Sequence, residues 1–217
     1  MKTKIDNIEI LSGDITSLDV DIIVNAANKT LLGGAGVDGA IHYKAGPELL
    51  EECKTLNGCE TGEAKITKAY KLPCKRIIHT VGPMFHSNPD KAPQLLKNCY
   101  LNSMKLAEQY RMENNLDKIS IAFPCISTGI YGYPKDEACK LAIDTIKEIN
   151  KHNIKENFTM DEINDYINVI LDYNIEEEKK RLTKLLHETN DSMKKVEIGQ
   201  KLVELKKLRG ENYDKWN

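Results

Sequence analysis

The amino-acid sequence predicts a layered α/β domain, with helices on both faces of a β-sheet, followed by a C-terminal α-helical extension. Short apolar runs typical of strands alternate with amphipathic helical patterns up to about residue 150. Two glycine-containing loops each lead from an apolar run into a helix. All seven prolines, all six cysteines and 11 of the 13 glycines precede Asn150, whereas residues 151–217 hold 13 Lys/Arg and 14 Asp/Glu. We therefore expect one domain over residues 1–152 and a charged helical extension over residues 153–217.

Each predicted element of the first domain rests on its own spacing of apolar residues. Strands are expected where apolar residues run together or alternate, and helices where they recur every three or four positions. The expected strands cover residues 8–11, 22–24, 64–70, 76–81 and 119–123. The first expected helix begins at Val37 or Asp38, is interrupted at Gly46-Pro47 and resumes over residues 48–54. Further amphipathic helices are expected over residues 96–107 and 138–149.

Composition and charge exclude several classes of function. A formal net charge of −2 provides no overall attraction to nucleic acid or to an anionic membrane, so we expect neither as a partner. No apolar run reaches the length of a membrane span, and residues 1–6 lack the apolar core of a signal peptide, so we expect a cytoplasmic protein. The cysteines form no C-x-x-C pair, and His42 and His79 fit ordinary positions in a helix and a strand. We therefore expect reduced thiols, no metal site and no cofactor.

The two glycine-containing loops predict a phosphate-binding site. Residues 25–28 and 31–39 follow the strand at residues 21–24, and residues 127–134 follow the strand at residues 119–123. Glycine lets backbone amides approach a ligand closely, and a helix N-terminus presents unpaired N–H groups with a partial positive charge. Because ligands of open α/β sheets bind beyond the carboxyl ends of the strands, we expect both loops at one edge of the sheet, around a diphosphate.

Several polar residues in these loops have both a structural and a functional interpretation. Asn25 is compatible with a simple turn, whereas Asn28 is followed by the glycine-rich loop and by an acid that opens a helix. Asp38 in a first helical turn interacts favourably with the helix dipole, which predicts a lowered pKa and a carboxylate that orients water but accepts protons weakly. Tyr131, between two glycines, either stacks on a sugar or base or covers its own loop.

Seven short motifs follow one another between residues 12 and 134 without large gaps. They are Ser12-Gly13-Asp14-Ile15-Thr16, Ile22-Ile23-Val24-Asn25-Ala26-Ala27-Asn28, Gly33-Gly34-Ala35-Gly36-Val37-Asp38-Gly39-Ala40-Ile41-His42, Ile78-His79-Thr80-Val81-Gly82-Pro83, Tyr100-Leu101-Asn102-Ser103, Ala122-Phe123-Pro124 and Ile126-Ser127-Thr128-Gly129-Ile130-Tyr131-Gly132-Tyr133-Pro134. In this order they resemble a macrodomain, specifically the MacroD-type family of ADP-ribosyl hydrolases and O-acetyl-ADP-ribose deacetylases. The resemblance covers about residues 5–150 and implies a three-layer α/β/α domain with a mixed central sheet.

The resemblance also implies roles for individual residues. Asn28 and Asp38 fall on the family's catalytic pair, which positions the distal ribose and the attacking water. Asp14 is implied to contact the adenine amino group, with Ile15 beside the ring. The residues implied to line the phosphate-facing loops are Gly34, Gly36, Val37, Ser127, Thr128, Gly129, Ile130 and Tyr131. Because Asp38 is expected to be a weak base, we favour a mechanism in which a phosphate of the bound nucleotide helps to deprotonate the water.

The activity implied by the resemblance is hydrolysis of ADP-ribosyl esters. The implied ligands are ADP-ribose, O-acetyl-ADP-ribose and mono-ADP-ribosylated proteins modified on acidic side chains. One alternative is a non-catalytic reader of ADP-ribose, and another is an interaction protein whose C-terminal extension binds a partner. The pair Asn28 and Asp38 favours the enzyme. Ala35 stands where the family usually has glycine and is expected to narrow the loop or restrict its backbone. Together with the atypical C-terminus, it favours the reader or a crippled remnant of the enzyme.

The residues after position 152 depart from the family's pattern, which returns promptly to a final strand. Residues 159–162 instead form a capping-box pattern, and apolar residues then recur at helical spacing up to Leu171. We therefore predict a helix over residues 159–172, although residues 166–173 are also compatible with the missing strand. A charged helical hairpin is predicted over residues 175–209, suited to packing on the domain or on a partner helix. It is weakly similar to the helical end of bacterial DNA primases.

Overall fold

The computed structural model describes residues 2–5, 8–11, 13–157 and 167–172, together with a few positions between 183 and 200. Along the chain the elements are β1 (Lys2–Ile5), β2 (Ile8–Leu11), η1 (Ile15–Ser17), β3 (Ile22–Ala27), α1 (Gly36–Ala45), α2 (Pro47–Thr55), β4 (Ala64–Lys68), β5 (Arg76–Val81), η2 (Phe85–Ser87), α3 (Ala92–Glu113), β6 (Ile119–Phe123), α4 (Lys135–Asn157) and β7 (Ile167–Asp172). None of the helices in these described parts has the length and apolar content of a membrane span.

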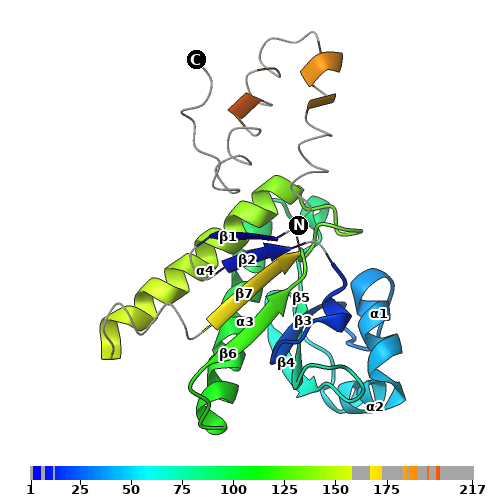
Figure 1. The fold of residues 1–217 in the computed structure, drawn as a ribbon. Helices are drawn as coiled ribbons and strands as arrows, with labels where there is room; N and C mark the ends of the chain where they lie inside the picture. The colour runs from blue at the N-terminus through cyan, green and yellow to red at the C-terminus, as the bar shows by residue number, and fades with distance from the viewer. Residues whose placement is uncertain are drawn as a thin grey trace.

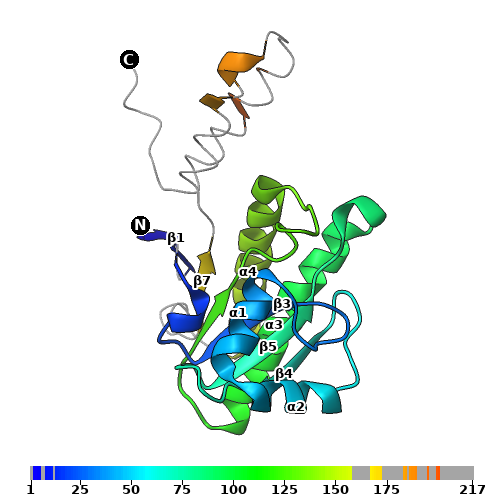
Figure 2. The same cartoon turned by 90° about the vertical axis from the view of Figure 1, so that its right-hand side faces the viewer.

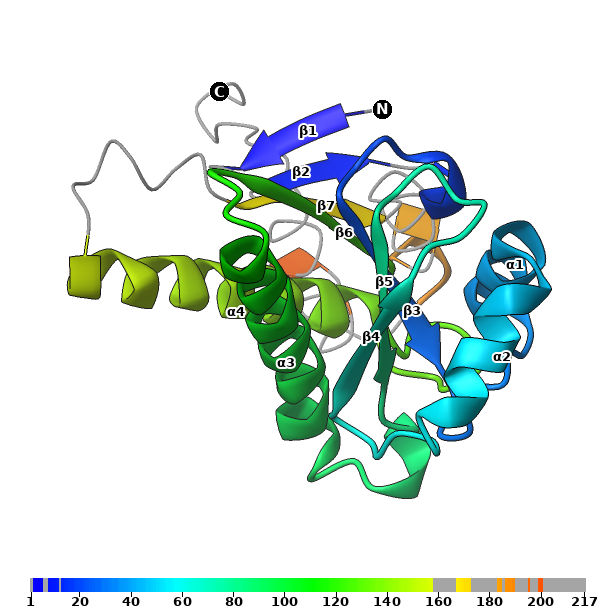
Figure 3. The ribbon, with the colours of Figure 1, turned by 90° about the horizontal axis from the view of Figure 1, so that it is seen from below.

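The centre of the fold is a seven-stranded mixed sheet with the strand order β1-β2-β7-β6-β3-β5-β4. β2, β7, β6, β3 and β5 run parallel, and the edge strands β1 and β4 pair antiparallel with β2 and β5. α1 and α2 cover one face, and α3 and α4 cover the other (Figures 1 and 3). The predicted three-layer α/β/α architecture is therefore confirmed.

The central strands are apolar because helices cover both of their faces. Ile22 and Val24 of β3 point into the core under α3 and α4, whereas Ile23 and Ala27 belong to the core under α1 and α2. Figure 2 is turned so that α1 and α2 lie toward the viewer, in front of β3 and β5. The cavity of the candidate site lies at the carboxyl ends of β3 and β6.

Residues 167–172 form strand β7, so the helix predicted over residues 159–172 is wrong at these positions and the domain does not end at residue 152. β7 pairs in parallel with both β2 and β6, and Val169 lies opposite Ile8 on one side and Ile121 on the other. An apolar run of this length fits both the helical and the strand period, and pairing with two distant segments decides between them. The β-branched residues in this run also favour a strand.

Most of the remaining extension lies outside the described residues. This applies to positions 159–166 of the predicted helix and to most of the hairpin predicted over residues 175–209. Within that hairpin, positions 183–184, 186–188, 195 and 199–200 are helical. The hairpin stays a prediction.

A chain truncated at residue 152 is expected not to fold. Without β7, strands β2 and β6 lose the neighbour that lies between them, and two rows of backbone N–H and C=O groups lose their partners. A chain truncated after Asn174 keeps β7 and is expected to unfold in one cooperative transition. Thermal unfolding followed by circular dichroism compares the two chains. A cooperative transition of native-like amplitude in the shorter chain would contradict this role of β7.

Candidate active site

A cavity of about 570 Å³ lies at the carboxyl ends of β3 and β6. Its walls are residues 26–28, 34–38, 82, 124–125 and 127–131. The two loops that were expected at one edge of the sheet therefore meet around one pocket. None of these lining residues is Lys or Arg. An anion in this pocket would be held by backbone N–H groups and a helix N-terminus rather than by cationic side chains.

The first loop is shaped by the side chain of Asn28 and by glycines. Asn28 Oδ1 accepts hydrogen bonds from the backbone N–H and the hydroxyl of Thr30 at 3.0 and 2.6 Å, and its Nδ2 donates to the Gly33 carbonyl at 2.8 Å. A Cβ atom at Gly39 would lie 2.5 Å from the Gly34 carbonyl oxygen. The loop therefore rests directly on the first turns of α1, which only a glycine at position 39 permits.

Helix α1 begins without a side-chain cap. Ala35 is the residue before its first turn, and in the part of the chain that the structure describes it makes no side-chain cap hydrogen bond. Ala35 has φ −102° and ψ 174°, an extended conformation that alanine adopts without strain. The expected restriction of the backbone by Ala35 is therefore wrong, and its methyl group is simply part of the pocket wall.

The second loop is a tight turn that leaves several amides unpaired. Ser127 has a positive φ of 66°, and the Tyr133 N–H donates to its carbonyl at 2.9 Å. A Cβ atom at Gly82 would collide with Ser127 Oγ, so glycine at the end of β5 lets this loop lie against it. No described group accepts a hydrogen bond from the backbone N–H groups of residues 129–131. These donors remain available to a ligand in the pocket.

Asp38 is a buried acid in the first turn of α1, with 4% of its surface exposed. Its Oδ1 accepts a hydrogen bond from Asn25 Nδ2 at 2.7 Å and lies 3.6 Å from His42 Nε2. Burial raises the pKa of Asp38 above its ordinary value, and this exceeds the lowering by Asn25 and His42. The expected lowered pKa is therefore wrong, because the loss of water on burial outweighs the hydrogen bond from Asn25 and the charge of His42. A carboxylate with a raised pKa is a better proton acceptor. The participation of a phosphate of the nucleotide in deprotonating the water stays a prediction.

Asp38 and Asn28 lie together on the pocket wall. A Cβ atom at Gly34 would lie 3.0 Å from Asp38 Oδ2 and 3.3 Å from Asn28 Nδ2. Gly34 thus brings the backbone of the first loop between the acid and the amide. The predicted catalytic pair is brought to one place, although its role in a reaction stays a prediction.

Two of the twelve predicted site residues lie outside the pocket. Asp14 accepts a hydrogen bond from the Thr16 N–H at 3.0 Å and forms an ion pair with Lys44 at 2.7 Å. Hydrogen bonds from Lys44 and Thr16 lower the pKa of Asp14 to about 2. Ile15 is buried in the core under α1 and α2. The ten other predicted residues line the cavity: Asn28, Gly34, Gly36, Val37, Asp38, Ser127, Thr128, Gly129, Ile130 and Tyr131.

Sequence reasoning missed a polar pair beneath Asp38. Asn25, compatible with a turn, and His79, considered an ordinary strand residue, are both completely buried and lie opposite each other on β3 and β5. Asn25 Nδ2 lies 3.1 Å from His79 Nδ1, and His79 Nε2 lies 2.9 Å from Thr67 Oγ1. The signal in the sequence was a polar residue inside each of two strands that are mostly apolar.

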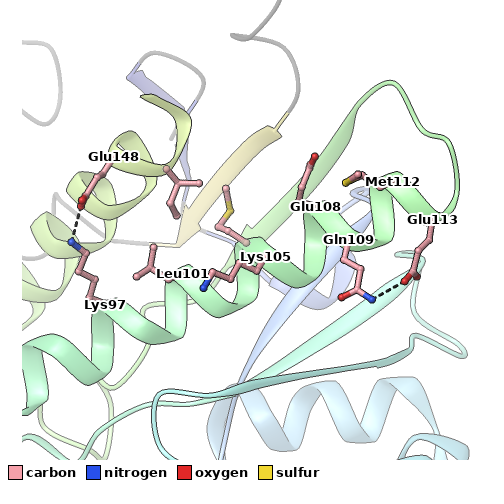
Figure 4. Close-up of a pocket in the computed structure, with 10 residues that line it drawn as sticks. Lys97, Leu101, Lys105, Glu108, Gln109, Met112, Glu113 and Glu148 are labelled. Atoms are coloured by element: carbon pink, nitrogen blue, oxygen red, sulfur yellow. Dashed lines mark hydrogen bonds and ion pairs between the residues drawn. The ribbon is translucent and has the colours of Figure 1, made fainter. Parts of the chain in front are cut away.

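A second and larger cavity, of about 680 Å³, lies between α3 and α4 (Figure 4). Its walls combine apolar side chains such as Met104 and Ile149 with charged ones. Lys97 pairs with Glu148 at 2.7 Å across its edge. It holds none of the predicted site residues, so the larger of these two cavities does not coincide with the predicted site.

The substitution Gly39→Ala is expected to destabilise the fold by about 1–3 kcal/mol, because the added methyl group would overlap the Gly34 carbonyl oxygen. Without that overlap, alanine in a helix would instead stabilise it by about 1 kcal/mol. Gly129→Ala is the matched control, since a Cβ atom there meets nothing within 4 Å. Urea unfolding measures both variants, and a Gly39→Ala protein as stable as the wild type would show that the loop does not rest on α1.

Comparison with known proteins agrees with this arrangement. The Macro domain family profile matches residues 24–142. A Macro domain-containing protein of Methanosarcina mazei is 55% identical over 157 residues, which are 72% of this chain and 81% of that protein. The ADP-ribose glycohydrolase MACROD2 of Mus musculus is 54% identical over 156 residues, which are 71% of this chain and 32% of that protein.

Two solved structures are similar over most of the chain. The Oceanobacillus iheyensis macrodomain with ADP has a TM-score of 0.67 and 40% identity, covering 87% of this chain and 97% of that one. The Trypanosoma brucei macrodomain in complex with ADP-ribose has a TM-score of 0.64 and 39% identity, covering 80% of this chain and 66% of that one. The fold, the paired loops and these similarities together show that the chain belongs to the Macro domain family.

Proposed function

We propose that this protein binds ADP-ribose and hydrolyses ADP-ribosyl esters. The substrates are O-acetyl-ADP-ribose, from which it would release acetate, and proteins that carry mono-ADP-ribose on acidic side chains. The observation that carries this proposal is the position of Asp38 and Asn28, which flank Gly34 on the wall of a pocket built from two amide-rich loops. The relatives named ADP-ribose glycohydrolase and the macrodomain structure in complex with ADP-ribose support it.

The size and polarity of the pocket suit a nucleotide-sugar. Its volume of about 570 Å³ falls within the range of about 300–1,000 Å³ usual for sites of small ligands. The N-terminus of α1 and the free N–H groups of residues 129–131 would hold the diphosphate from its two sides. Tyr131, half-buried at the pocket wall, would lie against a sugar.

The chemistry assigned to Asp38 is that of a general base. Its ionised carboxylate would orient a water molecule and accept one of its protons, while Asn28 positions the distal ribose. In deacetylation the water oxygen bonds to the acyl carbon, and the ribose hydroxyl leaves with a proton. In removal from a protein side chain, the water oxygen bonds to the anomeric carbon of the ribose, and the side-chain carboxylate leaves.

A non-catalytic reader of ADP-ribose would use the same pocket without turnover. The buried Asp38 favours the enzyme, because a binding module gains nothing from a buried carboxylate near an anionic ligand. Measuring binding and turnover on the same variants separates the two functions.

Asp38→Ala is expected to keep its affinity for ADP-ribose within about threefold and to lose turnover by about 10²–10⁴-fold, the usual contribution of a general base. Turnover is measured as ADP-ribose release from an auto-modified transferase and as acetate release from O-acetyl-ADP-ribose. Asn28→Ala serves as the companion variant and is expected to lose turnover of both substrates. Unchanged turnover in Asp38→Ala would refute the role of Asp38, and binding without turnover in the wild type would establish a reader.

Turnover is expected to fall as the pH falls through the pKa of Asp38, because only the ionised carboxylate accepts a proton. Burial raises this pKa, so the loss should begin at a higher pH than for a water-exposed aspartate. The profile of kcat/KM from about pH 4 to pH 8 tests this, since the ordinary aspartate pKa is about 3.9. A profile that stays flat down to that ordinary value would contradict the assignment.

A further inference from the structure

We propose that His79 is a positioning residue that orients the side-chain amide of Asn25, so that its NH2 group faces Asp38 and holds that carboxylate ready to accept a proton. His79 does not line the pocket, and it would act only through Asn25. The effect on turnover rests on the proposed hydrolytic function, whereas the hydrogen-bond arrangement can be tested without it.

The fold brings these groups together from five elements. Asn25 on β3 and His79 on β5 are register partners, and both side chains are fully buried. The titratable groups that face this pair are Asp38 and His42 from α1 and Cys53 from α2, whose Sγ lies 3.8 Å from His79 Nε2. From β4 the neighbour is the hydroxyl of Thr67, which does not titrate.

The hydrogen bonds in this chain have one self-consistent direction. Asn25 Nδ2 donates to Asp38 Oδ1 at 2.7 Å, and the same NH2 group lies 3.1 Å from His79 Nδ1. His79 Nδ1 must therefore be an acceptor, which leaves the ring proton on Nε2. Nε2 lies 2.9 Å from Thr67 Oγ1, and that hydroxyl donates in turn to the Lys68 carbonyl at 3.1 Å. Each donor in this chain therefore faces a group that can accept its hydrogen bond.

The opposite orientation of the Asn25 amide would set Oδ1 against the Asp38 carboxylate. In the orientation found, no described donor reaches the buried Oδ1 of Asn25, so one polar atom is left unpaired. Leaving a buried acceptor unpaired is costly, and the orientation therefore depends on a second acceptor for the same NH2 group, which His79 Nδ1 provides. Burial lowers the pKa of His79 to about 3, so the ring is neutral at physiological pH and Nδ1 stays available.

The cluster also has the composition of a metal site, since ligand atoms of His42, Cys53 and His79 lie within 4.8 Å of one another. Both ring nitrogens of His79 are already engaged, by Asn25 and by Thr67. These contacts therefore form a hydrogen-bonded network that ends at Asp38.

Two substitutions separate the two ring nitrogens of His79. His79→Asn places an amide oxygen near the position of Nδ1 and keeps an acceptor for Asn25. His79→Gln reaches the position of Nε2 and keeps the contact with Thr67, but it has no acceptor where Nδ1 was. The pair is matched, because both variants replace the ring by a neutral amide and neither adds a charge.

The proposal predicts opposite outcomes for the two variants. His79→Gln is expected to lose about tenfold in turnover at neutral pH, because the Asp38 carboxylate is no longer held in the geometry in which it accepts a proton from water. The acid limb of its pH profile should move to higher pH, because loss of the Asn25 donor raises the pKa of Asp38 further. His79→Asn should retain turnover within about threefold and keep the wild-type profile. Calorimetry should show unchanged ADP-ribose affinity in both, since His79 does not touch the pocket.

Nuclear magnetic resonance tests the arrangement without any turnover. In the full wild-type chain, ¹⁵N shifts of His79 should show a proton on Nε2 and none on Nδ1, and ¹³C titration should place the pKa of Asp38 higher in His79→Gln than in the wild type or His79→Asn. A proton on Nδ1, or the same titration of Asp38 in all three proteins, would overturn the proposal. The tautomer measurement needs only the wild type, so it decides even where a variant does not fold. A wild type with the expected tautomer but no hydrolysis would refute the proposed function alone.

Discussion

The hydrogen bond between Asn25 and Asp38 joins the central sheet to the first turn of α1, and the geometry of the pocket depends on it. Asn25 is fixed by its register with His79, and Asp38 is fixed by the helix that carries the first loop. Among the described residues, Asp38 has no Lys or Arg as an ion-pair partner. A buried carboxylate without a strong cation keeps a raised pKa, so its ionised form depends on one well-placed N–H donor. The same hydrogen bond therefore holds α1 on the sheet and favours the ionised form of Asp38.

The pocket divides its tasks between backbone and side chains. Both loops offer N–H groups, and glycines at positions 34, 39 and 82 permit the close approaches that bring the first loop to α1 and the second loop to the end of β5. The proposed catalytic pair, Asp38 and Asn28, shares the wall beside Gly34. Because no lining residue is cationic, recognition of an anion depends on backbone geometry and not on net charge. This explains how a chain of formal charge −2 presents an anion site.

Features with a local cause could be predicted from the sequence, and features that arise from distant pairing could not. The alternation of strands and helices and the meeting of the two loops followed from apolar spacing and from the position of loops after parallel strands. β7 was predicted to be helical because capping signals and apolar spacing are local, whereas its two strand partners are far away in the sequence. The pKa of Asp38 was predicted in the wrong direction, because its position in the helix is visible in the sequence but its burial is not. Asn25 and His79 gave only a weak signal, and their contact needs the strand register.

The central claim is that two backbone loops hold the diphosphate of a nucleotide-sugar without help from cationic side chains. Isothermal titration calorimetry of the wild-type protein with ADP-ribose, and with adenosine as the analogue that lacks the diphosphate, tests it most directly. The account predicts saturable binding of one ADP-ribose per chain and no measurable heat with adenosine at the same concentrations. Equal binding of both compounds, or no heat with ADP-ribose, would contradict it.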